Sequence, residues 1–122
     1  MKKSFSILIV EDESALLGIL ADKFRREGFL AITAEDGTEG LKAALKHKPD
    51  LIILDLIMPS MDGLQMLKKL RENKWGQNVE VLILSNLSDA EINDDKVEYL
   101  VKSNWGLDDV VKKVKETLEI LT

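Results

Sequence analysis

The chain has 122 residues, which is enough for one compact domain and too few for two. Hydrophobic residues make up 45% and charged residues 32%, so a core and a hydrated surface are both available and disorder is excluded. The net charge of -5 argues against nucleic acid and anionic lipid as partners, because both need a cationic surface.

Five short segments rich in branched and aromatic residues predict strands. They cover residues 5–10, 29–34, 51–55, 79–84 and 97–101. Three of them are almost wholly apolar, as is typical of parallel strands that are covered on both faces.

Apolar residues at helical spacing lie between these strands. They predict helices over residues 15–24, 38–46, 64–70 and 107–121, and Gly28 is expected to end the first. Strand and helix thus alternate about five times, which favours an α/β fold with one doubly wound parallel sheet and right-handed crossovers.

The connection between the last two predicted strands is unusually short. It runs from residue 86 to residue 96, close to the minimum of about a dozen residues for a parallel crossover. Ser88 and Glu91 have the spacing of a capping box that could start a helix, and Asn93 begins a polar run that would end it after about one turn. The fourth helix of the fold, which would lie between these two strands and before the helix over residues 107–121, is therefore expected to be shortened or missing.

Several other classes of function are disfavoured by what the chain contains. It has no cysteine, which excludes disulfides and thiolate chemistry, and no apolar run approaches the roughly 20 residues of a membrane span. Paired basic residues such as Lys68-Lys69 and Lys112-Lys113 have acids nearby and are interpreted as solvated helix faces. We expect a cytoplasmic protein that does not bind membranes.

Polar residues follow four of the predicted strands, at the sheet edge where such folds bind ligands. They are Glu11 and Asp12, then Asp55, Ser85 and Lys102. Carboxylates gathered at one edge repel one another unless a cation neutralises them. Oxygen ligands without histidine or cysteine favour a hard ion, and Mg²⁺ above zinc or copper.

A bound Mg²⁺ would suit Asp55 as a nucleophile toward a phosphoryl group. Such transfers depend largely on positioning and charge neutralisation. Lys102 would add a second positive charge, and the Ser85 hydroxyl would donate to a phosphoryl oxygen.

This set of residues resembles the receiver domain of two-component response regulators. The resemblance rests on Glu11-Asp12, on Asp55 within LDLIMPSMDG, on Ser85 within LILSN and on Lys102 within YLVKS, and it extends over residues 1–122. It implies a flavodoxin-like sheet of order 2-1-3-4-5 and a stand-alone, single-domain regulator.

The resemblance also implies a role for each matching residue. Asp55 would be the phosphoacceptor. Asp12 and Asp55 would bind Mg²⁺ together with the backbone carbonyl of Ile57, and Glu11 would support the metal indirectly.

Two further residues would form the switch. The Ser85 hydroxyl would move toward the phosphate, and Tyr99 would turn inward on activation. A histidine kinase or phosphotransfer protein would donate the phosphoryl group, and a downstream protein would recognise the activated state. Beyond self-phosphorylation from a phosphodonor and autodephosphorylation, no enzymatic activity is expected.

Alternatives remain open at this point. Ser103 stands where receivers usually have proline, which together with the short 86–96 connection motivates a pseudo-receiver that binds proteins independently of phosphorylation. A phosphatase with an aspartyl nucleophile is disfavoured, because Ile57 occupies the place of its usual second acid. Asp12 could instead cap the first helix, and Tyr99 could simply pack.

Overall fold

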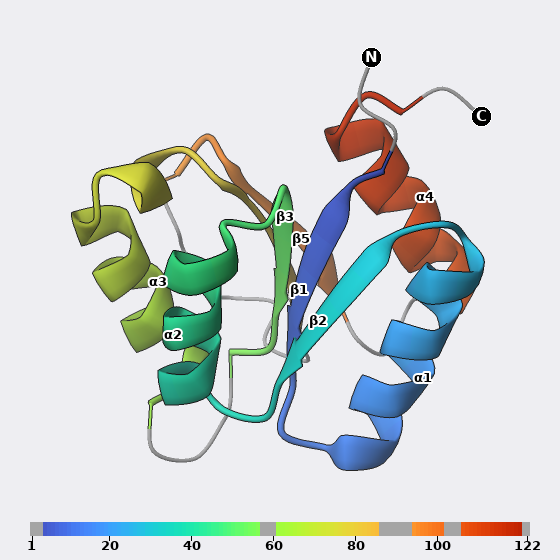
Figure 1. The fold of residues 1–122 in the computed structure, drawn as a ribbon, viewed down its shortest axis with the longest axis horizontal. Coiled ribbons are helices and arrows are strands. Elements are labelled where there is room, and N and C mark those ends of the chain that lie inside the picture. The colour runs from blue at the N-terminus through green and yellow to red at the C-terminus, as the bar shows by residue number, and fades with distance from the viewer. Residues whose placement is uncertain (1–3, 57–60, 86–93, 102–105, 121–122) are drawn as a thin grey trace.

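The computed structural model describes residues 4–56, 61–85, 94–101 and 106–120. Five strands form one parallel sheet in the order β2-β1-β3-β4-β5 (Figure 1). The strands are β1 (Ser6–Val10), β2 (Leu30–Ala34), β3 (Leu51–Leu54), β4 (Glu80–Ser85) and β5 (Val97–Val101). The predicted fold class and strand order are confirmed.

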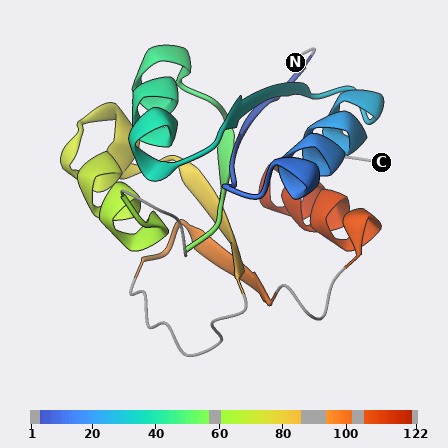
Figure 2. The ribbon, with the colours of Figure 1, turned by 90° about the horizontal axis from the view of Figure 1, so that it is seen from below.

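Helices cover both faces of the sheet. They are α1 (Ser14–Arg26), α2 (Gly37–His47), α3 (Gly63–Glu72), the short 3-10 helix η1 (Trp75–Gln77) and α4 (Leu107–Thr117). α1 and α4 lie on one face, and α2 and α3 lie on the other (Figures 1 and 2). Gly28 follows the end of α1 with φ of +93°, a left-handed conformation that favours glycine, so its predicted role is confirmed.

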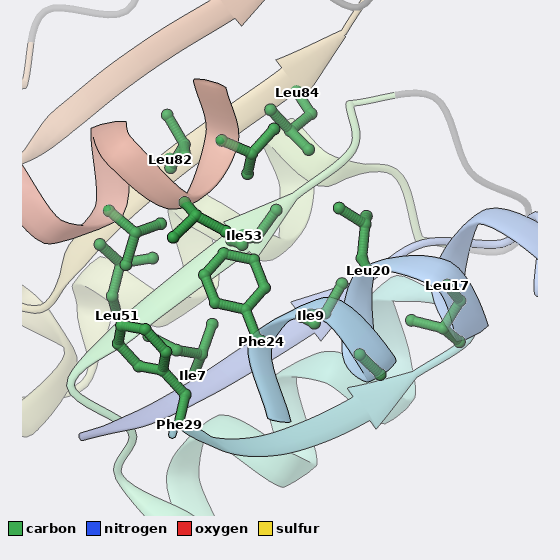
Figure 3. Close-up of a cluster of buried hydrophobic side chains, with 14 residues drawn as sticks. Ile7, Ile9, Leu17, Leu20, Phe24, Phe29, Leu51, Ile53, Leu82 and Leu84 are labelled. Carbon is green, nitrogen blue, oxygen red and sulfur yellow. The ribbon is translucent and has the colours of Figure 1, made fainter. Parts of the chain in front are cut away.

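Each face of the sheet carries its own hydrophobic core. Beneath α1 and α4, Phe24 packs edge-on against Phe29 with ring centroids 5.3 Å apart (Figure 3). Beneath α2 and α3, Met66 and Leu70 pack against the opposite faces of the same central strands. The central strands β1, β3 and β4 are buried on both sides, which explains their nearly continuous apolar sequences.

Two differences from the predicted elements have local causes. The last helix ends at Thr117 rather than at residue 121, because Glu119 adopts a left-handed conformation with φ of 57° and ends the helical run. The helix η1 was not predicted; the Asn73 side chain accepts hydrogen bonds from the amides of Trp75 and Gly76 and stabilises this turn. The prediction of a fourth helix that is shortened or missing, which rests on Ser88 and Glu91, falls outside the described residues.

Within the described ranges, no helix combines the length and the apolar character that a membrane crossing requires.

Candidate functional site

Glu11 and Asp55 are brought together by the register of the two central strands. Val10 pairs with Leu54 at the end of the β1–β3 ladder, so the next residue of each strand lies at the same level of the sheet. The Asp55 amide donates to the Val10 carbonyl at 3.1 Å, and the Glu11 amide donates to the Ala34 carbonyl at 3.1 Å. Both backbones are therefore held by extensions of the sheet ladders.

Asp12 completes a cluster of three carboxylates with these residues. Each of the three offers an oxygen that lies within 4.8 Å of the other two. Glu11 and Asp55 are only 2% and 6% exposed, whereas Asp12 is exposed. The cluster joins two buried acids to one at the solvent boundary, and an incoming ion would meet Asp12 first.

Asp12 does not cap the first helix. Helix α1 begins at Ser14, its N-cap residue is Glu13, and no side chain makes a capping hydrogen bond there. The amide of Glu13 instead donates to the Glu11 carboxylate at 3.0 Å, which orients that side chain. The alternative assignment of Asp12 as a helix cap is thus wrong.

The chemistry of this cluster fits a hard divalent cation. Its donors are all carboxylate oxygens, the ligand type that Mg²⁺ prefers, and none is an imidazole or thiolate. Two largely buried acids so close together also repel each other, and a cation relieves that repulsion. The predicted ligands Asp12 and Asp55 are brought together, and the Glu11 carboxylate joins them in the same cluster.

The start of α3 fixes the backbone that follows Asp55. The Gly63 amide donates to the Leu56 carbonyl at 2.9 Å. A Cβ atom on Gly63 would collide with the backbone oxygen of Asp55 and would lie 2.7 Å from Cα of Leu56. Only glycine permits this close approach, so Gly63 sets the position of Asp55.

The turn before Gly63 is held by reciprocal capping of α3. The Asp62 side chain accepts from the Gln65 amide at 2.9 Å, and the Gln65 side chain accepts from the Asp62 amide at 3.3 Å. The spacing of aspartate and glutamine indicates such a cap in the sequence. Gly63 ends the LDLIMPSMDG segment on which the family resemblance rests, but its close approach to Asp55 depends on tertiary packing.

The structure describes only two of the other predicted site residues, Ser85 and Tyr99. Ser85 is the last residue of β4, at the same sheet edge as Asp55, and its backbone pairs with Val101 of β5. Tyr99 is half-buried on β5 beside Ile83, and burial raises the pKa of its hydroxyl. The predicted contributions of Lys102 and of the Ile57 carbonyl fall outside the described residues.

Comparison with known proteins agrees with this arrangement. The family model of the response regulator receiver domain matches residues 7–121. The chain is 39% identical over 115 residues to the response regulator ArlR of Staphylococcus aureus, covering 94% of this chain and 48% of that protein. It is 36% identical over 107 residues to the alkaline phosphatase synthesis transcriptional regulatory protein PhoP of Bacillus subtilis, covering 88% and 41% respectively. The chain thus spans about half the length of these relatives.

Solved structures show the same fold. The receiver domain of the Francisella response regulator 1452 superimposes with a TM-score of 0.81 at 28% identity, covering 94% of this chain and 97% of that one. The response regulator TrrA of Thermotoga maritima, solved in complex with Mg(2+)-BeF, superimposes with a TM-score of 0.80 at 31% identity, covering 93% and 98%. From the family match, the fold and the acidic cluster together, the chain belongs to the receiver domains of two-component response regulators.

Proposed function

We propose that the chain, over residues 1–122, is a cytoplasmic switch that accepts a phosphoryl group on Asp55 in a Mg²⁺-dependent reaction. The observation that carries the proposal is the convergence of Glu11, Asp12 and Asp55 at the carboxyl edge of the sheet. The Mg(2+)-BeF complex of the Thermotoga relative supports it, because that protein shares the fold and 31% of its sequence with this chain.

In the proposed reaction, a carboxylate oxygen of Asp55 attacks the phosphorus atom of a phosphohistidine. The bond between phosphorus and the histidine nitrogen breaks, the electron pair leaves with the nitrogen, and an acyl phosphate remains on Asp55. A histidine kinase or phosphotransfer protein would be the donor. Bound by Asp12, Asp55 and the Ile57 carbonyl with support from Glu11, Mg²⁺ would neutralise charge on the phosphoryl oxygens.

Phosphorylation of Asp55 would then change the conformation of the protein surface. Ser85 would donate its hydroxyl and Lys102 its ammonium group to phosphoryl oxygens, as charge-assisted hydrogen bonds. Tyr99 and the segment of residues 86–97 would then change conformation, and a downstream protein would bind this activated state. Moving such an equilibrium from 1:99 to 99:1 requires about 5.5 kcal/mol, to which these contacts would contribute a part.

A phosphodonor experiment tests this proposal. The chain is incubated with acetyl phosphate, with and without Mg²⁺, and its intact mass is measured. We expect a gain of one phosphoryl group that needs Mg²⁺ and is absent in Asp55→Asn. The matched control is Asp95→Asn, which removes an exposed carboxylate at the opposite edge of the sheet and should leave the gain intact.

The same experiment separates the proposed function from the pseudo-receiver. If the mass of the unmodified chain does not change with Mg²⁺ and donor, and beryllofluoride with Mg²⁺ leaves its amide NMR spectrum unaltered, the switch is refuted. Phosphorylation that persists in Asp55→Asn would instead refute the choice of acceptor.

A further inference from the structure

A groove of about 380 Å³ lies between α2 and α3, and none of its lining residues belongs to the acidic cluster. We call it the α2–α3 groove; its lining residues are Thr38, Met61, Gln65, Lys68, Lys69 and Glu72. The side chains that α3 contributes are spaced at three and four residues, so they form one continuous row along that helix. All but Met61 are exposed, and the groove is open to solvent.

Helix α2 extends this row with two more cations. Lys42 and Lys46 lie one and two turns beyond Thr38, on the same side of the helix, and both are exposed. Each of α2 and α3 connects two parallel strands, so the two helices run in the same direction (Figures 1 and 2). The start of α2 lies against the backbone of Met61, just before α3, so successive turns of the two helices are level.

Two lysines on the other side of the molecule have acidic partners. On the α1–α4 side, Lys23 pairs with Asp108 at 2.9 Å and Lys115 pairs with Glu27 at 3.1 Å. Across the ranges that the structure covers, no carboxylate forms an ion pair with any of the four lysines of the α2–α3 side. Those four are Lys42, Lys46, Lys68 and Lys69.

We propose that the α2–α3 groove is a docking surface for an acidic segment of a protein partner. The argument is charge complementarity: four lysines outnumber Glu72, the one carboxylate among the lining residues of the groove, on a chain whose net charge is -5. The half-buried Met61 and the Thr38 hydroxyl give the groove an apolar contact and a neutral donor, which suit a peptide.

The dimensions of the groove favour a peptide over nucleic acid. From Thr38 to Lys46 the helix rises by about 12 Å, a length that holds only a few carboxylates or phosphates. A nucleic acid strand extends its charges far beyond that length, and at one end of the groove it would approach the acidic cluster of Glu11, Asp12 and Asp55. A short acidic segment avoids this repulsion.

The test uses two synthetic peptides of about a dozen residues. One is rich in aspartate and glutamate, and the other carries asparagine and glutamine at the same positions. Each is titrated into the isotope-labelled chain at low salt, with amide NMR shifts as the readout. We expect only the acidic peptide to bind. Its binding should shift the amide NMR signals of Thr38, Lys42, Lys68 and Lys69.

Charge reversal supplies a matched pair of variants. Lys68→Glu with Lys69→Glu should weaken binding of the acidic peptide about tenfold, from two lost cations and two added repulsions. Lys112→Glu with Lys113→Glu changes the net charge equally on α4 and should weaken binding less than about twofold. Circular dichroism confirms that both variants are folded.

Several results would overturn the inference. They are equal loss of affinity in both variants, shifts that map outside the groove, equal binding of the neutral peptide, or no binding at low salt. Single-stranded DNA and vesicles with anionic lipid serve as competitors. Tighter binding of either one in the groove would show that the surface serves a different class of partner.

Discussion

Arg71 of α3 donates through Nε to the carboxylate of Asp94, 2.8 Å away, and so joins α3 to the turn that precedes β5. The same guanidinium donates at 2.8 Å to the carbonyl oxygens of Gly76 and Val79. Asp94 in turn accepts from the Lys96 amide at 2.9 Å. One side chain therefore holds the end of α3, the η1 turn and the approach to β5 at the amino edge of the sheet, opposite the acidic cluster.

Replacing Arg71 by alanine should destabilise the fold. The side chains of Arg71 and Asp94 are only 17% and 21% exposed, so the change leaves a partly buried carboxylate and two carbonyls without their donor. We expect a loss of about 2–3 kcal/mol in the free energy of unfolding, measured by urea denaturation. Arg71→Lys should cost about half as much, because an ammonium group cannot span all three acceptors.

The control for this prediction is an ion pair of the same kind at the surface. Arg26 and Asp22 lie 2.8 Å apart on α1 with side chains 76% and 60% exposed. Arg26→Ala should change the free energy of unfolding by less than about 0.5 kcal/mol. An equal loss of unfolding free energy in both variants would show that the contacts of Arg71 stabilise the fold no more than a surface ion pair does.

Asp94 should make stability depend on pH in the acid range. Burial raises the pKa of this carboxyl, but the Arg71 and Lys96 hydrogen bonds and the Arg71 charge outweigh it and hold the pKa below its ordinary value of 3.8. A lowered pKa stabilises the fold above the ordinary value, and that stabilisation is lost as the pH falls through the folded-state pKa.

The measurement compares the chain with Asp94→Asn by urea denaturation across pH. The difference between their free energies of unfolding should be constant above about pH 5 and should shrink below the ordinary value of 3.8. A difference that stays constant through the acid range would contradict the ionised pair with Arg71.

Gly63→Ala should disturb both the fold and the site, because the added methyl group meets the backbone of Asp55 and Leu56. We expect a loss of about 1–3 kcal/mol in the free energy of unfolding and weaker Mg²⁺ binding by isothermal titration calorimetry. Gly18→Ala is the matched control. Gly18 lies inside α1, and a Cβ atom added there would meet no other atom within 4 Å, so the substitution should stabilise the chain by about 0.5–1 kcal/mol. Unchanged Mg²⁺ affinity in Gly63→Ala would argue against its positioning of Asp55.

Asp55→Asn should lose most of the stabilisation that Mg²⁺ gives the unmodified chain, because one of the three clustered carboxylates is removed. With Mg²⁺ at 100 times its dissociation constant, the unmodified chain should gain about 2.7 kcal/mol, and the variant should gain much less. Thermal or urea unfolding with and without Mg²⁺ measures both. Equal gains in the two proteins would exclude Asp55 as a ligand.

The sheet, its covered central strands and the edge where acids gather could all be predicted from the sequence, because apolar periodicity and the polar residues at strand ends are local properties of the chain. Glu11, Asp12 and Asp55 follow from that pattern. Their distances from one another do not, because they depend on the register in which Val10 pairs with Leu54. Likewise, Gly63 against Asp55, Arg71 with Asp94, and the lysines of two helices along one groove join residues distant in the chain. Only the packed structure brings such groups together, because their interactions depend on separation in space.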